Sequence, residues 1–121
     1  MPTWNIEDYE AEDGTDPVAD FIQSLTPAER GRVAARLQVL QQEGLNARTE
    51  YIHKLRGKIW ELRLPKSQNN PRILFFAVVG RRIILLHGFS KTGQRSNKVP
   101  ESEINKAEKR MKEFLEREGL L

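Results

Sequence analysis

Three apolar segments of strand length, close together in the chain, constrain the fold more than any other feature of this sequence. They span residues 59–64, 73–79 and 83–89, and each is rich in β-branched or aromatic residues. Residues 65–71 contain two prolines and separate the first pair, and Gly80-Arg81-Arg82 is short enough for a tight hairpin between the second pair. The pattern predicts three consecutive antiparallel strands.

Basic residues are concentrated on and around these segments. Residues 48–98 contain twelve lysines and arginines against two acidic residues, whereas residues 1–47 contain three basic and nine acidic residues. A concentrated positive region is typical of proteins that bind nucleic acid, although it also occurs on the solvated rim of a sheet. If the acidic residues 1–47 (the acidic head) and the basic residues 48–98 (the basic sheet) both stay exposed, the head cannot neutralise the charge of the sheet. We then expect an acidic segment of a partner to cover part of the sheet.

The composition indicates a soluble globular protein. A chain of 121 residues can bury a core without disulfides, and we expect one domain over residues 1–121. The chain has no cysteine, which excludes thiolate chemistry, and two histidines without a Cys/His cluster predict no metal site. The acidic N-terminus lacks the apolar core of a signal peptide, and no apolar run has membrane-spanning length. We therefore expect a cytoplasmic protein that does not bind membranes.

Two helices are predicted before the strands, each from a local start signal. Asp16-Pro17 reads as a cap followed by proline at the first helical position, which predicts a helix over residues 17–25. Thr26-Pro27-Ala28-Glu29 is a capping box, which predicts a second helix that ends near Gly44. These two helices form a helical hairpin, and we expect its apolar face to be covered by a sheet.

The remaining segments complete an α+β fold. Residues 3–9 have the spacing of a short strand, and residues 45–58 are expected to be a connecting segment. Pro100 opens a last helix, and its apolar residues share one stripe: Ile104, Ala107, Met111, Phe114 and Leu115. The predicted order is β-α-α-β-β-β-α, with the helical hairpin packed on a mainly antiparallel sheet.

Arg63 is the first candidate for a functional residue. On the strand over residues 59–64, Glu61 and Arg63 share one face, which we expect to be partly open, while the other face is apolar. An arginine in the middle of a sheet is costly to place unless it is paired or used, and Glu61 offers a structural ion pair as the alternative. Trp60, on the apolar face, is either core or a base-stacking residue.

Several segments, taken in order, are similar to a known family. They are Lys54-Leu55-Arg56-Gly57 with Ile59-Trp60-Glu61-Leu62-Arg63, then Pro71-Arg72-Ile73, then Ile84-Leu85-Leu86-His87-Gly88-Phe89 with Lys91, and a proline-initiated amphipathic helix. In this order and spacing the chain resembles the RelE/ParE toxin superfamily of bacterial type II toxin–antitoxin systems. The resemblance is greatest to the HigB-like, phage-derived branch and covers nearly the whole chain.

The resemblance implies a small RelE-like domain with a curved sheet and no metal or organic cofactor. It implies an endoribonuclease that cleaves messenger RNA, usually on the translating ribosome, and that an antitoxin neutralises. In the HigB-like branch this antitoxin is typically a helix-turn-helix (HigA-like) protein, through which the complex binds operator DNA. The alternatives are a ParE-like toxin that inhibits DNA gyrase by protein binding, and a non-catalytic RNA-binding module.

Metal-free RNA cleavage by the neighbouring 2′-OH sets the chemical requirements for the site. A base must remove the 2′-OH proton, cations must stabilise the charge on the phosphorane, and an acid must protonate the leaving 5′-oxygen. Arginine suits the second role because its planar fork donates to phosphate through two parallel hydrogen bonds. Arg63 and Arg72, which lie in or at strands, are the leading candidates, followed by Arg56.

Candidates for the base and the acid are the two histidines and two lysines. His87 has a suitable intrinsic pKa and shares a strand face with Phe89, but a lone histidine in an apolar strand is often structural. His53 is a second candidate, and Lys54 or Lys91 can act if neighbouring cations lower the lysine pKa. The predicted catalytic residues are Arg63, Arg72, Lys91 and His87. The predicted RNA-binding residues are Lys54, Arg56, Lys58, Arg81, Arg82, Arg95 and Lys98.

Overall fold

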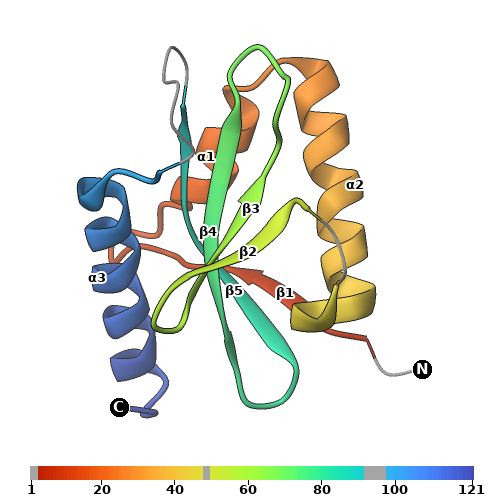
Figure 1. The fold of residues 1–121 in the computed structure, drawn as a ribbon. Helices are drawn as coiled ribbons and strands as arrows, with labels where there is room; N and C mark the ends of the chain where they lie inside the picture. The colour runs from red at the N-terminus through yellow and green to blue at the C-terminus, as the bar shows by residue number, and fades with distance from the viewer. Residues whose placement is uncertain (1–2, 48–49, 92–97) are drawn as a thin grey trace.

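A five-stranded sheet with helices on both faces forms the framework of the protein (Figure 1). The computed structural model describes residues 3–47, 50–91 and 98–121. The strands are β1 (Asn5–Asp8), β2 (Ile52–Arg56), β3 (Ile59–Arg63), β4 (Pro71–Val78) and β5 (Arg82–Ser90). The helices are α1 (Pro17–Gln23), α2 (Pro27–Glu43), the short 3-10 helix η1 (Gly44–Asn46) and α3 (Glu101–Arg117).

The spatial order of the strands is β1-β5-β4-β3-β2. Strands β2 to β5 are antiparallel neighbours, and β1 joins β5 as a parallel strand at the opposite edge. The structure confirms the predicted α+β class and the mainly antiparallel sheet, an arrangement consistent with a small RelE-like domain.

The strand β2 is an element that the sequence analysis missed. Residues 45–58 were expected to form a connecting segment, but the order along the chain is β-α-α-β-β-β-β-α. Gly57, whose φ of +55° favours glycine, forms the two-residue turn with Lys58 between β2 and β3. Because β2 is an edge strand with polar residues toward solvent, it lacks the apolar run that marks an inner strand.

The helices α1 and α2 begin at the predicted signals. The Asp16 carboxylate accepts a hydrogen bond from the backbone N–H of Ala19 at 2.9 Å, although α1 ends two residues earlier than predicted. The capping box of α2 is complete: the Glu29 N–H donates to the Thr26 hydroxyl, and the Thr26 N–H donates to the Glu29 carboxylate, each at 3.2 Å. Gly44, with φ of +61°, ends α2 as predicted.

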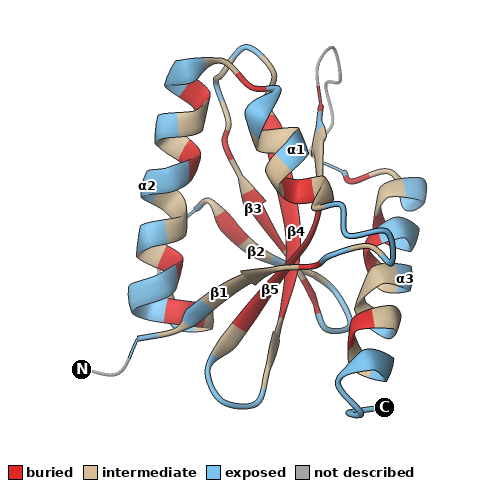
Figure 2. Cartoon of the chain, turned by 180° about the vertical axis from the view of Figure 1, so that it is seen from behind, coloured by how far each residue is buried: buried red, intermediate tan, exposed pale blue. Residues whose placement is uncertain are grey.

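The sheet separates two apolar cores, and Figure 2 shows buried residues along its central strands and on the sheet-facing sides of the helices. Helices α1 and α2 cover one face, where the partly buried Trp60 packs against the core. Helix α3 covers part of the other face, where Ala107 and Phe114 pack against Ile59 and Phe76. The stripe predicted for the last helix is therefore core. No helix within the described ranges is long and apolar enough to cross a membrane.

A one-residue shift in the β4–β5 pairing changes which residues of β5 face α3. Phe75 pairs with Leu85, but Leu74 pairs with His87, so Leu86 is an extra residue in β5. Phe89 and Lys91, two and four residues after His87, therefore lie on the same face of the sheet as His87, which is the face that α3 covers.

Candidate functional site

The registers of β2 to β5 place candidate residues in adjacent rows on the face of the sheet that α3 partly covers. Directly paired residues of antiparallel strands point to the same face. One row, in which each residue pairs with the next, contains His53, Glu61, Leu74 and His87. The next row, beside the β3–β4 loop, contains Arg63, Arg72 and Phe89. The two predicted arginines therefore lie side by side on this face.

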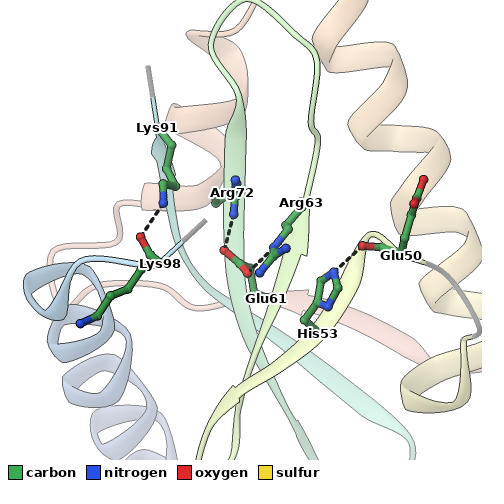
Figure 3. Close-up of polar contacts among 7 residues, drawn as sticks. All are labelled: Glu50, His53, Glu61, Arg63, Arg72, Lys91 and Lys98. Atoms are coloured by element: carbon green, nitrogen blue, oxygen red, sulfur yellow. Dashed lines mark hydrogen bonds and ion pairs between the residues drawn. The ribbon is translucent and has the colours of Figure 1, made fainter. Parts of the chain in front are cut away.

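Glu61 lies between two arginines, with Lys91 nearby on the side of Arg72 (Figure 3). Its buried carboxylate accepts a hydrogen bond from Arg63 Nε at 2.7 Å and another from Arg72 Nη1 at 2.9 Å. Lys91 lies close enough to Glu61, Arg63 and Arg72 for their charges to act on its pKa. We call Glu61, Arg63, Arg72 and Lys91 the cationic cluster. It contains three positive groups and one carboxylate, so two positive charges are not balanced within it.

The members of the cationic cluster differ in exposure. The side chain of Arg63 is 23% exposed, whereas Arg72 and Lys91 are each 1% exposed. The Lys91 ammonium donates a hydrogen bond to the backbone carbonyl of Lys98. Burial, followed by the positive charge of Arg72, lowers the pKa of Lys91. Lys91 therefore releases its proton more readily than an exposed lysine does.

His87 lies on the same face of the sheet but beneath α3. Its Nε2 is 2.7 Å from a carboxylate oxygen of Glu103, and its Nδ1 is 3.1 Å from Nη1 of Arg110. Burial lowers the pKa of His87, and the imidazole stacks on Phe89 with ring centroids 5.7 Å apart. Because both ring nitrogens are engaged by α3, this geometry favours the structural alternative for His87.

His53 lies at the other end of that row, beside Glu61 on the edge strand β2. Its Nε2 is hydrogen bonded to the backbone carbonyl of Glu50. A carbonyl oxygen can only accept, so Nε2 is the donor, and in the neutral ring the lone pair is on Nδ1. The histidine with a geometry suited to accepting a proton is therefore His53.

The predicted RNA-binding residues do not gather at the cationic cluster. Lys98, which is exposed, adjoins the cluster through its carbonyl group. Lys54 pairs with Trp60 and so belongs to the face covered by α1 and α2. Lys58 and Arg81 lie in the β2–β3 and β4–β5 turns, at the opposite end of these hairpins from the cluster.

Two further predicted RNA-binding residues form ion pairs within the protein. Arg56 bonds to two glutamates of α3, and Arg82 bonds to Glu7 and Glu118. The expectation that the acidic head leaves the basic sheet unneutralised is therefore wrong for Arg82, because the short parallel strand β1 brings Glu7 beside it. Arg95 falls outside the described residues.

Part of the cationic cluster was predictable from the sequence. Glu61 and Arg63 share a strand face, and the structure confirms the ion pair expected as the alternative for Arg63. The sharing of the same carboxylate by Arg72 was not predicted. That contact depends on the pairing of Arg63 with Arg72 across β3 and β4, and no local signal in the sequence sets this register.

The site is built from cations rather than from metal ligands. Both carboxylate oxygens of Glu61 accept hydrogen bonds from arginines. Over residues 3–47, 50–91 and 98–121, no group of three or more histidine, aspartate or glutamate side chains is arranged to hold a metal ion.

Residues 20–112 match the family model described as phage-derived protein Gp49-like (DUF891). The match covers most of the chain and includes every member of the cationic cluster. The chain belongs to the phage-derived Gp49-like family. Gp49-like proteins are a toxin-like family of toxin–antitoxin systems, and membership implies an antitoxin partner. No curated protein matches the chain.

Proposed function

We propose that this Gp49-like protein is a toxin that cleaves messenger RNA in the cytoplasm, on the translating ribosome, without a metal ion. The observation that carries the proposal is the cationic cluster, in which two arginines share one buried carboxylate and Lys91 lies close to them. A surplus of positive charge at a partly open end of a sheet suits a phosphate group, because fixed cations stabilise the charge that develops there. Family membership supports the toxin part of the proposal.

The reaction forms a bond between the 2′-oxygen and phosphorus while the bond from phosphorus to the 5′-oxygen breaks. The products are a 2′,3′-cyclic phosphate and a 5′-OH end. Arg63, the most exposed member of the cluster, binds the phosphate oxygens, and the buried Arg72 adds positive charge. Glu61 is a positioning residue, because it holds both guanidinium groups on a rigid sheet.

Two residues are assigned to the proton transfers. His53 Nδ1 takes the proton from the 2′-OH, since its Nε2 is committed to the Glu50 carbonyl. Lys91 gives a proton to the leaving 5′-oxygen, because arginine does not release protons in proteins and the pKa of Lys91 is lowered. The Lys91 ammonium must exchange its contact with the Lys98 carbonyl for the RNA.

The antitoxin is proposed to be a helix-turn-helix protein, with operator DNA bound only through the toxin–antitoxin complex. The implied antitoxin partner supports this, and so does the basic character of residues 48–98. An acidic antitoxin segment that covers the cationic cluster would neutralise its surplus charge and block RNA at once.

Primer extension on messenger RNA after brief induction tests the proposed function. Wild type is compared with Arg63→Ala and with Lys112→Ala, a matched control that removes an exposed cation of α3. We expect new 5′ ends inside translated regions for wild type and for the control, and none for Arg63→Ala. Retained folding of Arg63→Ala is checked by circular dichroism.

The other outcomes discriminate among the alternatives. New ends with all three proteins would show that Arg63 is not required for cleavage, and would contradict its assignment to the phosphate. Growth arrest without new ends would support the protein-binding toxin that inhibits DNA gyrase. Absence of both arrest and cleavage would leave a non-catalytic RNA-binding module.

A further inference from the structure

Glu29 connects the start of α2 to the loop between β3 and β4. Glu29 is 3% exposed, and its carboxylate accepts hydrogen bonds from the backbone N–H of Asn69 at 2.9 Å and from Asn69 Nδ2 at 2.6 Å. The same carboxylate completes the capping box with Thr26. One side chain therefore closes the end of a helix and clamps a loop that is 40 residues away in the chain.

The clamp depends on the negative charge of Glu29. Burial alone would raise the pKa of this carboxyl group, but the hydrogen bonds from Asn69, Thr26 and Ser67 outweigh burial and hold the pKa at about 2. Glu29 is thus ionised across the neutral and mildly acidic range, and it acts only as an acceptor.

The clamped loop also holds the backbone of Lys91. Asn70, directly after Asn69, accepts a hydrogen bond from the Lys91 N–H through its carbonyl oxygen at 3.2 Å. Asn70 has φ of +43°, in the left-handed region, which asparagine adopts more readily than other residues that have a side chain. The contacts of Asn69 with Glu29 restrain the backbone one residue before it.

We propose that Glu29 is a positioning residue for Lys91. Through Asn69 and Asn70 it fixes the backbone at the end of β5, and this keeps the Lys91 ammonium within the cationic cluster. The consequence for cleavage rests on the proposed function, whereas the placement of Lys91 can be measured independently of activity. Helix α2, which forms part of the opposite face of the molecule, thereby contributes to the geometry of the site.

The variant Glu29→Gln tests the clamp with little change in shape. Glutamine replaces one acceptor oxygen with an amide that only donates, so one of the two Asn69 donors loses its partner. Thr26→Ala is the matched control, because it weakens the cap of the same helix but keeps both Asn69 contacts.

The first readout is the pKa of Lys91, measured by NMR titration of lysine side-chain nitrogens and assigned with Lys91→Arg. In wild type we expect Lys91 to titrate below the exposed lysines, because burial and Arg72 lower its pKa. In Glu29→Gln we expect the pKa of Lys91 to rise toward that of the exposed lysines. In Thr26→Ala it should stay at the wild-type value.

The second readout is cleavage of a messenger RNA bound to translating ribosomes in a purified translation system. We expect Glu29→Gln to lower kcat by about tenfold, with KM within about twofold of wild type, because Lys91 donates its proton after the RNA is bound. In the pH profile of kcat, the alkaline limb should shift to higher pH as the pKa of Lys91 rises. Thr26→Ala should change neither quantity by more than about twofold.

A folded Glu29→Gln protein with the wild-type pKa at Lys91 would overturn the proposal. If Glu29→Gln does not fold, Asn69→Ala breaks the same contact from the loop side, and an unchanged Lys91 pKa in that variant would overturn it equally. Wild-type cleavage by Lys91→Ala would instead remove Lys91 from the proposed function, and the NMR titration would still decide whether Glu29 positions it.

Discussion

The cationic cluster and a groove at the opposite side of β5 are both charge-imbalanced, but with opposite signs. The cluster has three cations and one carboxylate. The groove lies between the N-terminal segment and the end of α3, and we call it the acidic groove; it is lined by Ile6, Glu7, Asp8, Glu10, Asp16, Phe114, Arg117 and Glu118. Arg82 bonds to Glu7 and Glu118 but leaves the other carboxylates of this groove in excess.

The two regions differ in how far a change of protonation can reduce their excess charge. In the acidic groove, burial and then the hydrogen bond with Asp16 raise the pKa of Asp8 to about 7, so this carboxyl is partly protonated near neutral pH. In the cationic cluster only Lys91 can respond in this way, because Arg63 and Arg72 do not lose their protons. Among the described residues, the acidic groove can therefore lower its excess charge by protonation near neutral pH, whereas the two arginines of the cationic cluster stay charged.

The largest expected effect is on cleavage by the cationic cluster. Arg63→Ala should lower the single-turnover cleavage rate by about 10²–10³-fold, because the variant loses a charge-assisted donor to the phosphate. Arg63→Lys, which keeps the charge but loses the planar fork, should fall between wild type and Arg63→Ala. Equal rates for the alanine and lysine variants would show that fork geometry has no part in catalysis.

The next effect concerns the stability of the same cluster. Glu61→Gln should lower the free energy of unfolding by about 3 kcal/mol, because it leaves the buried Arg72 without its charged partner. Urea denaturation monitored by tryptophan fluorescence measures this change. A stability equal to that of wild type would mean that the surplus charge of the cluster is tolerated without Glu61.

Stability should depend on pH through the acidic groove. The pKa of Asp8 is raised from 3.8 to about 7 on folding, so the folded protein binds this proton more tightly than the unfolded chain does. Stability from this group is present below about pH 4 and is lost as pH rises through about 7. A shift of this size corresponds to about 4 kcal/mol for a buried group, and partial exposure of Asp8 reduces it to about half. Asp8→Asn should therefore be more stable than wild type by about 2 kcal/mol at pH 8.5, and equal to it at pH 4, by urea denaturation at each pH.

The smallest effect is expected at Arg82, where the acidic groove is partly neutralised. Arg82→Ala should lower the free energy of unfolding by about 1 kcal/mol, since the Arg82 side chain is 27% exposed and its pairs with Glu7 and Glu118 are screened by water. The difference should shrink as salt is raised from 50 mM to about 500 mM. A loss that does not respond to salt would show that Arg82 acts by packing rather than by charge.

Features set by neighbouring residues were predictable from the sequence. The caps at Asp16 and Thr26, the apolar strands and the stripe of α3 all follow from spacing along the chain, and the structure confirms them. The sequence could not show that Arg72 shares Glu61 with Arg63, or that α3 engages both nitrogens of His87. Both contacts depend on register and packing between segments far apart in the chain.

The extra residue Leu86 in β5 has a consequence for how such a site can arise. In a strand without this bulge, every second residue from Leu86 onward would face α3. Lys91 would then point to the other face of the sheet, which α1 covers. The one extra residue reverses the alternation and places Lys91 on the same face as Arg63 and Arg72. A single-codon insertion or deletion in β5 can thus add or remove a cation of the cluster with no change in any charged residue.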